Sequence, residues 1–258
     1  MAILELQNIN HYFGGLHAVS DFSMNVEEGE LIGLIGPNGA GKTTIFNLVS
    51  GFYKPTEGEI KFCGKSISGL KPHEVTGLGL ARTFQNIRLW NSMTVLENLC
   101  ISQHYRLGYG FIDSVIQTGR YAVREKEVIK SAREFLEILD LMEYENEYPK
   151  NLPYGLQRRL EIGRALTIRP KLLLLDEPAA GMAAGDIEQL IKLVKWIREK
   201  FKLTIWLIEH QMKVVMGLCE RICVLDFGEI IAEGIPSEIK RNPRVIKAYL
   251  GEEVTVHA

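Results

Sequence analysis

The glycine-rich run GPNGAGKT, from Gly36 to Thr43, has the residue types and the spacing that hold a phosphate group. It matches the pattern G-x-x-x-x-G-K-[ST], in which glycines adopt backbone angles closed to other residues and successive N–H groups turn toward one polyphosphate. Lys42 is expected to reach the terminal phosphates, and the Thr43 hydroxyl to hold Mg²⁺. The residues predicted to bind a nucleotide in this loop are Gly36, Pro37, Asn38, Gly39, Ala40, Gly41, Lys42, Thr43 and Thr44.

Two adjacent carboxylates, Asp176 and Glu177, end the apolar run KLLLLDEP. Mg²⁺ prefers carboxylate and water oxygens, and a neighbouring parallel strand would bring Asp176 to the metal. Glu177 would point to the opposite side of an extended chain, toward an attacking water, so we predict that it is the general base. Such a pair can also cap a helix, but Pro178 and the strand context favour catalysis.

Buried strands and a helix must position these groups. The runs LIGLIG, KLLLLDEP and LTIWLIEH are continuously apolar, which is typical of parallel strands covered on both faces. Near the N-terminus, apolar and polar residues alternate, which predicts antiparallel strands. The alternating apolar residues are Leu4, Leu6, Phe22, Met24 and Val26. We therefore predict an α/β fold with a mostly parallel core sheet and an N-terminal antiparallel β subdomain.

The segment 87–168 has helical rather than strand periodicity. One helical face gathers the apolar residues Val128, Ala132, Phe135, Leu136 and Leu139. This pattern predicts a helical subdomain inserted into an α/β core formed by residues 1–86 and 169–258. Within the insert, Ser102 to Arg124 has weak periodicity, so we expect an irregular excursion or a short extra helix there.

Composition narrows the possible partners. Hydrophobic residues make up 46% of the 258 residues, enough for a substantial core, and the net charge of −2 argues against nucleic acid as a partner. Four cysteines lack the paired spacing of a zinc site or a disulfide framework, which indicates free thiols in a reducing compartment. No apolar stretch approaches the roughly 18 to 20 residues that span a bilayer, so we expect a membrane role only through a partner.

Together these motifs resemble the nucleotide-binding subunits of ABC transporters, from about Leu4 to Gly251. The resemblance implies a P-loop, RecA-like core in a single ATPase domain that binds ATP and Mg²⁺. It also implies that Gln85, in ARTFQNIRL, contacts the metal, and that His210, in LIEHQM, contacts the γ-phosphate. Phe13 stands where the family places an aromatic ring on adenine, although Tyr12 could serve.

The family signature LSGGQ is similar to LPYGLQ here. In the family this segment grips the γ-phosphate of ATP held by another subunit, but Pro153 supplies neither a hydroxyl nor an N–H group. A proline is tolerated at a first helical position, so the helix dipole remains available. Ala183 is a second departure, because the family usually has Asp or Asn there. The signature residues expected to face the partner's ATP are Leu152, Pro153, Tyr154, Gly155 and Gln157.

Within the family, the strings DEPAAG, RRLEIGRAL, ARTFQNIRLW and MTVLENL resemble the LivG-type subunits of branched-chain amino acid importers. This implies a LivF-like ATPase partner or a second copy of the chain, two permease subunits, and, indirectly, an external binding protein. It also implies a peripheral place on the cytoplasmic face of the membrane. The apolar residues beside Gln85, namely Ile87, Leu89 and Trp90, would form the coupling surface or pack in the core.

Other functions share parts of this pattern. ATPases of urea or amide importers and of lipopolysaccharide exporters have similar motifs. A non-transport ABC ATPase would need a coiled-coil insert, tandem cassettes or a basic surface, which this sequence lacks. A non-hydrolysing regulatory module would be expected to lack the base, whereas Glu177 is present.

Overall fold

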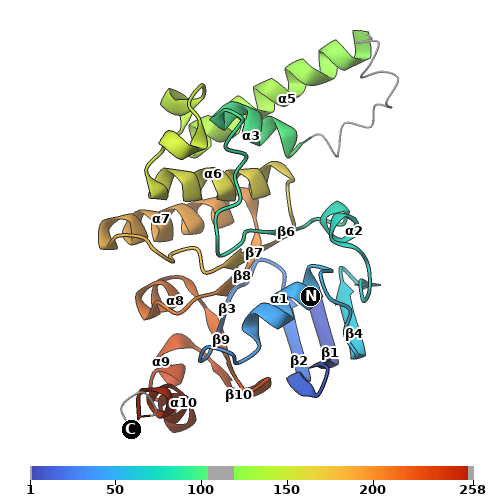
Figure 1. Cartoon of the computed structure of the whole chain (residues 1–258), viewed down its shortest axis with the longest axis vertical. Helices are drawn as coiled ribbons and strands as arrows, with labels where there is room; N and C mark the ends of the chain where they lie inside the picture. The colour runs from blue at the N-terminus through green and yellow to red at the C-terminus, as the bar shows by residue number, and fades with distance from the viewer. Residues whose placement is uncertain (1, 104–118, 255–258) are drawn as a thin grey trace. The chain divides into compact units, whose positions relative to one another are not determined.

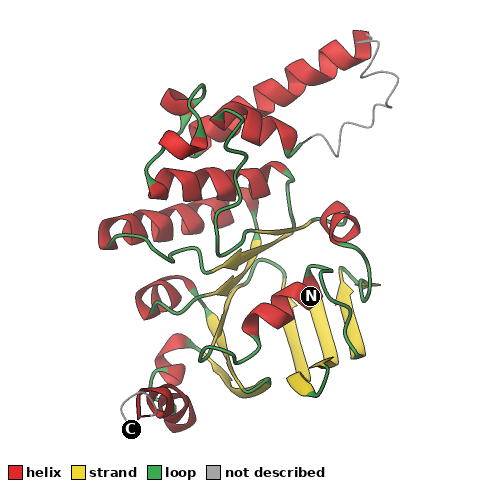
Figure 2. Ribbon diagram, viewed as in Figure 1, coloured by secondary structure: helices red, strands yellow, loops and turns green. Residues whose placement is uncertain are grey.

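The chain divides into two compact units, Met1–Gln85 with Lys171–Ala258, and Asn86–Pro170. The structure, a computed structural model, describes residues 2–103 and 119–254. The first unit contains all the strands described, and the elements described in the second unit are all helices (Figures 1 and 2). No helix among the described residues is long and apolar enough to cross a membrane.

Two sheets form the first unit. The smaller is antiparallel, with the order β2-β1-β4-β5, and the larger has the order β10-β9-β3-β8-β7-β6. In the larger sheet only the β9–β10 pair is antiparallel. The predicted antiparallel and mostly parallel sheets are therefore confirmed. The strands are β1 (Ala2–Phe13), β2 (Leu16–Glu27), β3 (Leu31–Ile35), β4 (Glu57–Phe62), β5 (Lys65–Ser66), β6 (Leu80–Arg82), β7 (Leu172–Asp176), β8 (Thr204–Ile208), β9 (Arg221–Asp226) and β10 (Glu229–Gly234).

Every residue of β3, β7 and β8 is buried, because both faces of the larger sheet are covered. Helix α1 packs on one face, and α7 and α8 lie on the other (Figure 1). Since side chains alternate along a strand, Ile32 and Leu34 of β3 share one core with Phe46 of α1. The helices of this unit are α1 (Lys42–Val49), α2 (Pro72–Gly77), α7 (Ala184–Phe201), α8 (Met212–Leu218), α9 (Pro236–Ile239) and α10 (Pro243–Val254).

The second unit packs helices around the apolar face predicted from the sequence. Its elements are α3 (Val95–Ile101), α5 (Gly119–Ile138), the 3-10 helices η2 (Met142–Tyr144) and η3 (Pro149–Asn151), and α6 (Tyr154–Thr167). The five apolar residues assigned to that face are all buried, so the prediction is confirmed. Gly163 on α6 permits close packing, because a Cβ there would lie 2.2 Å from Cδ1 of Leu139.

The segment Ser102 to Arg124 departs in part from its prediction. Residues 104–118 lie outside the described residues, but Gly119 to Arg124 form the first turns of the 20-residue helix α5. The prediction allowed a short helix here, but the weak periodicity of these residues did not show that they begin a helix of 20 residues, whose apolar face becomes regular only from Val128 onward.

The four cysteines are free, and we expect them to differ sharply in reactivity. Burial raises the pKa of the Cys100 thiol to about 11 and those of Cys219 and Cys223 to about 12, because a thiolate is disfavoured away from water. At pH 8 these three thiols stay protonated, whereas Cys63 is exposed. A colorimetric thiol reagent should therefore label one cysteine quickly in the native protein and all four in denaturant. More than one fast native thiol would contradict this burial.

Candidate active site

The phosphate-binding loop joins β3 to α1 through glycines in the left-handed region. Gly36, Gly39 and Gly41 have φ of 150°, 78° and 101°, so the predicted glycine angles are confirmed. Gly36 also allows a close approach, because a Cβ there would lie 1.9 Å from the carbonyl oxygen of Leu225 on β9. A side chain at this position would push the loop away from the sheet.

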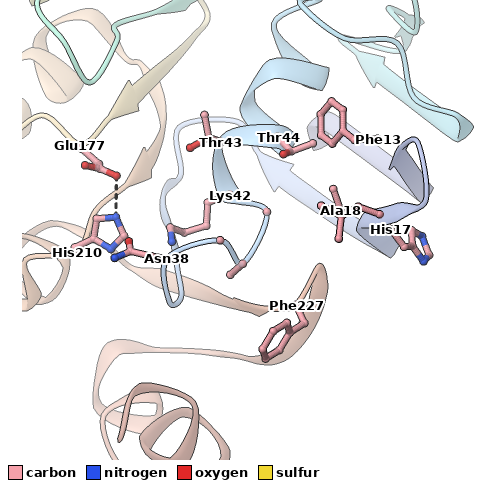
Figure 3. A pocket seen from close by; sticks show the side chains of 14 residues that line it. Phe13, His17, Ala18, Asn38, Lys42, Thr43, Thr44, Glu177, His210 and Phe227 are labelled. Atoms are coloured by element: carbon pink, nitrogen blue, oxygen red, sulfur yellow. Dashed lines mark hydrogen bonds and ion pairs between the residues drawn. The ribbon is translucent and has the colours of Figure 1, made fainter. Parts of the chain in front are cut away.

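A cavity of about 360 Å³ opens over this loop. Lys42 is buried beside it, and its Nζ donates hydrogen bonds of 2.7 Å to the carbonyl oxygens of both Gly36 and Pro37. These bonds hold the ammonium group in the mouth of the loop (Figure 3). The residues predicted from the sequence that line this cavity are Phe13, Asn38, Gly39, Ala40, Gly41, Lys42, Thr43, Thr44, Glu177 and His210.

The carboxylate of Glu177 lies on the wall of the same cavity, between two polar side chains. Its Oε1 is 2.7 Å from Nε2 of His210, the pair joined by a dashed line in Figure 3, and its Oε2 accepts a hydrogen bond of 2.6 Å from Nε2 of Gln85. The side chain of Glu177 is only 14% exposed. The structure thus brings together the three residues that we predicted to be catalytic.

Glu177 does not continue the extended strand, contrary to our prediction. Strand β7 ends at Asp176, and Glu177 has φ of 46°, in the left-handed region rather than in an extended chain. Its N–H donates to the carbonyl oxygen of Ile208 at 2.9 Å, which fixes this turn against β8. A left-handed backbone is uncommon at residues other than glycine. Where it does occur, it is often at a functional site.

Asp176 also lies differently from the expectation. It ends β7, which is not adjacent to the loop-bearing β3, because β8 lies between them. Its carboxylate is buried, and Oδ2 accepts a hydrogen bond of 2.7 Å from Arg82. The sequence could not distinguish a first from a second neighbour among equally apolar strands.

Glu209 is a buried carboxylate that sequence reasoning missed. Its Oε1 accepts from the N–H of Ala179 at 2.8 Å, and its Oε2 accepts from the N–H groups of His210 and Gln211 at 2.8 and 3.0 Å. The Gln211 side chain donates in turn to the carbonyl oxygen of Ala179 at 3.0 Å. The side chains of Glu209 and Gln211 therefore connect the backbone after Glu177 to the segment that carries His210.

Residues from outside the known motifs complete the cavity. Leu16, His17 and Ala18 of β2 line one part of it, and Phe227 lines another. Phe227 is 89% exposed, with φ of 43° at the turn between β9 and β10. Tyr12 stacks on His17 with ring centroids 4.1 Å apart, while Phe13 itself lines the cavity, which favours Phe13 as the adenine contact.

The signature residues lie in the helical unit, around the start of α6. Tyr154 is the first helical residue, and Pro153 takes the cap position, with φ −52° and ψ 148°, rather than the first helical position that we expected. Gln157 folds back, and its Nε2 donates to the carbonyl oxygen of Leu152 at 2.9 Å. In the first unit, Ala183 caps α7 and provides no side-chain hydrogen bond to the helix.

The donor atoms around the loop fit a nucleotide with its divalent cation. Backbone N–H groups and the Lys42 ammonium suit phosphate oxygens, and a Cβ at Gly39 would meet nothing within 4 Å, so the loop leaves room beside it. The Thr43 hydroxyl and the Asp176 carboxylate are oxygen donors, which Mg²⁺ prefers. Fold and site therefore define a P-loop nucleotide hydrolase.

Comparison with known proteins identifies the class. Residues 19–180 match the ABC transporter family, and residues 229–255 match the family described as branched-chain amino acid ATP-binding cassette transporter. The chain belongs to the ABC transporter family and is one of its ATP-binding, ATP-hydrolysing subunits.

Particular relatives are similar over nearly their whole length. The high-affinity branched-chain amino acid transport ATP-binding protein BraF of Pseudomonas aeruginosa is 44% identical over 250 residues, which cover 97% of this chain and 98% of BraF. LivG of Salmonella typhimurium, described in the same words, is 44% identical with the same coverage. A solved ATP-binding cassette of an ABC transporter in its ADP conformation is 34% identical, with a TM-score of 0.85 over 97% of this chain and 99% of that one.

Proposed function

We propose that this chain is the ATP-driven motor subunit of an importer of branched-chain amino acids. The names of BraF and LivG support the cargo, at 44% identity over almost the entire chain. The proposal of ATP hydrolysis rests on one observation: the Glu177 carboxylate is held by Gln85 and His210 in the cavity that Lys42 also lines. Transport of urea, amides or lipopolysaccharide is the alternative for the same motor.

The residues of the cavity have different roles in hydrolysis. Lys42, Thr44 and the amides of residues 36–43 bind the phosphates, and Phe13 contacts the adenine. When bound by Thr43 and Asp176, with Gln85 nearby, Mg²⁺ would offset negative charge on the phosphates. Glu177 accepts the proton of the attacking water, and His210 orients the Glu177 carboxylate and contacts the γ-phosphate.

The signature segment would act on ATP bound by a second ATPase subunit. We propose that this partner is a different, LivF-like chain, because Pro153 and Ala183 weaken the contacts that this chain can make across the dimer to the partner and its ATP. The site formed by this chain's own loop and the partner's signature is then the stronger of the two. Closure around the triphosphate and reopening after hydrolysis would drive two permease subunits.

The surface for the permease includes Ile87, Leu89 and Trp90 of the helical unit. Ile87 and Leu89 are half-buried, whereas Trp90 is 44% exposed, with the guanidinium of Arg164 lying 4.5 Å from its ring centroid. Such an aromatic with an adjacent cation is typical of a protein interface. This contact would hold the chain at the cytoplasmic face of the membrane.

Purification and transport together test this function. The tagged chain should copurify with a second ATPase and two membrane subunits, and the complex in proteoliposomes should take up leucine, isoleucine and valine when an external binding protein and internal ATP are supplied. Glu188→Gln, on the exposed face of α7, is the matched variant that should transport normally. Uptake of urea, or ATP turnover stimulated only by a lipopolysaccharide, would contradict the assigned cargo.

A further inference from the structure

Arg82 lies at the end of β6, three residues before Gln85, and its side chain is only 5% exposed. One nitrogen, NH2, donates to Oδ2 of Asp176 at 2.7 Å. The other terminal nitrogen, NH1, donates to Oδ1 of Asn47 at 2.7 Å and to Oγ of Ser50 at 2.9 Å. Arg82 therefore links the carboxylate at the end of β7 to α1, the helix that begins at the phosphate-binding loop.

Aromatic rings enclose the same guanidinium. Its central carbon lies 5.6 Å from the ring centroid of Phe46, 5.9 Å from that of Phe52 and 5.1 Å from that of Phe84. Phe46 is itself held by an edge contact with the buried Trp206, at 5.1 Å between centroids. With hydrogen bonds at its edge and rings around it, the guanidinium has one orientation, which a flexible lysine ammonium would not reproduce.

We propose that Arg82 is a positioning residue that sets the affinity for the nucleotide's divalent cation by orienting Asp176. This inference rests on the proposed function, in which Asp176 holds Mg²⁺. Arg82 engages Oδ2 and so fixes the plane of the carboxylate relative to α1. In the segment ARTFQ the sequence indicates a binding role for Gln85, and nothing in its pattern indicates a role for Arg82.

If Arg82 acted only through its charge, its removal would change the metal affinity in the opposite direction. A cation next to a metal-binding carboxylate competes with the metal, so its removal alone would tighten metal binding. Positioning predicts a weaker metal site instead, because a carboxylate free to rotate must be ordered by the metal itself. Partners that orient metal ligands typically contribute about 10- to 100-fold to metal affinity.

The test measures metal and nucleotide binding separately from turnover. Mn²⁺ is titrated by electron paramagnetic resonance into the full chain saturated with ADP, and ADP affinity is measured calorimetrically in EDTA. Arg82→Lys, which keeps the charge but loses the fork, should weaken Mn²⁺ binding about 10- to 100-fold. The affinity for ADP in EDTA should stay within about twofold of that of the unmodified chain. Arg198→Lys is the control, because the Arg198 guanidinium binds the Gly29 carbonyl and the Glu220 carboxylate in the same unit, and it should change neither affinity.

A second variant guards against loss of folding, because breaking a buried ion pair is strongly destabilising. Asn47→Ala removes one support of the guanidinium and leaves the Arg82–Asp176 pair in place, so it should weaken Mn²⁺ binding in the same direction by a smaller factor. Unchanged or tighter Mn²⁺ binding in both variants, or an equal loss of metal-free ADP binding, would overturn the inference. Failure of the unmodified chain to bind ADP would instead count against the proposed function.

Discussion

Glu177→Gln is expected to lower ATP hydrolysis by about 10²- to 10⁴-fold while ATP binding is kept, because the amide cannot accept the proton of the attacking water. The amide has nearly the same shape as the carboxylate and retains an oxygen for Gln85 or His210. ATP should therefore accumulate in the closed dimer. Phosphate release by the assembled complex measures turnover, and retention of radiolabelled ATP after gel filtration measures the trapped state.

Glu188→Gln is the matched control for this change, since Glu188 is an exposed glutamate of α7 that pairs only with Lys213 among the described residues. It should hydrolyse ATP at the normal rate and trap none. Turnover that survives Glu177→Gln would remove Glu177 as the base and leave the carboxylate as an anchor for its two neighbours.

Lys42→Met is expected to weaken ATP binding by about 10- to 100-fold. Hydrogen bonds to charged groups contribute about 1.5 to 3 kcal/mol each, and 1.4 kcal/mol corresponds to a factor of ten in affinity. Methionine keeps much of the length of the side chain but removes the cation from the mouth of the loop. Calorimetry with ATP on the purified chain measures the loss, and Lys195→Met on the exposed side of α7 should bind ATP normally.

The same substitution tests the asymmetry proposed for the dimer. In the assembled transporter, Lys42→Met should reduce ATP turnover more than the equivalent lysine change in the partner ATPase, because the site built on this chain's loop uses the partner's signature. Equal losses from the two changes would argue for two equivalent sites, and therefore against a functional effect of Pro153 and Ala183.

Much of the fold was predictable because its strands have distinct patterns. The fully buried β3, β7 and β8 appear as continuous apolar runs, and β1 and β2 alternate because they face a core on one side only. The glycine angles of the loop followed from the same local reasoning, since few other residues accept such backbone angles. Local pattern and local chemistry were sufficient for these features.

The rest depends on contacts between distant residues. The separation of β7 from β3 by β8 is a matter of sheet order, which apolar runs of equal character do not encode. The left-handed turn at Glu177 is stabilised by a hydrogen bond to Ile208, about thirty residues away. Arg82 and Glu209 acquire partners only after folding, so neither stood out among the charged residues of the chain.

Glu209 joins the segment after Glu177 to the segment that carries His210. Its two oxygens accept the N–H of Ala179, which follows Glu177, and the N–H groups of His210 and Gln211. A displacement of the chain at Ala179 that the Glu209 side chain follows would strain the hydrogen bond from the N–H of His210. We therefore expect a shift of the segment after Glu177 to reach His210 through this one carboxylate.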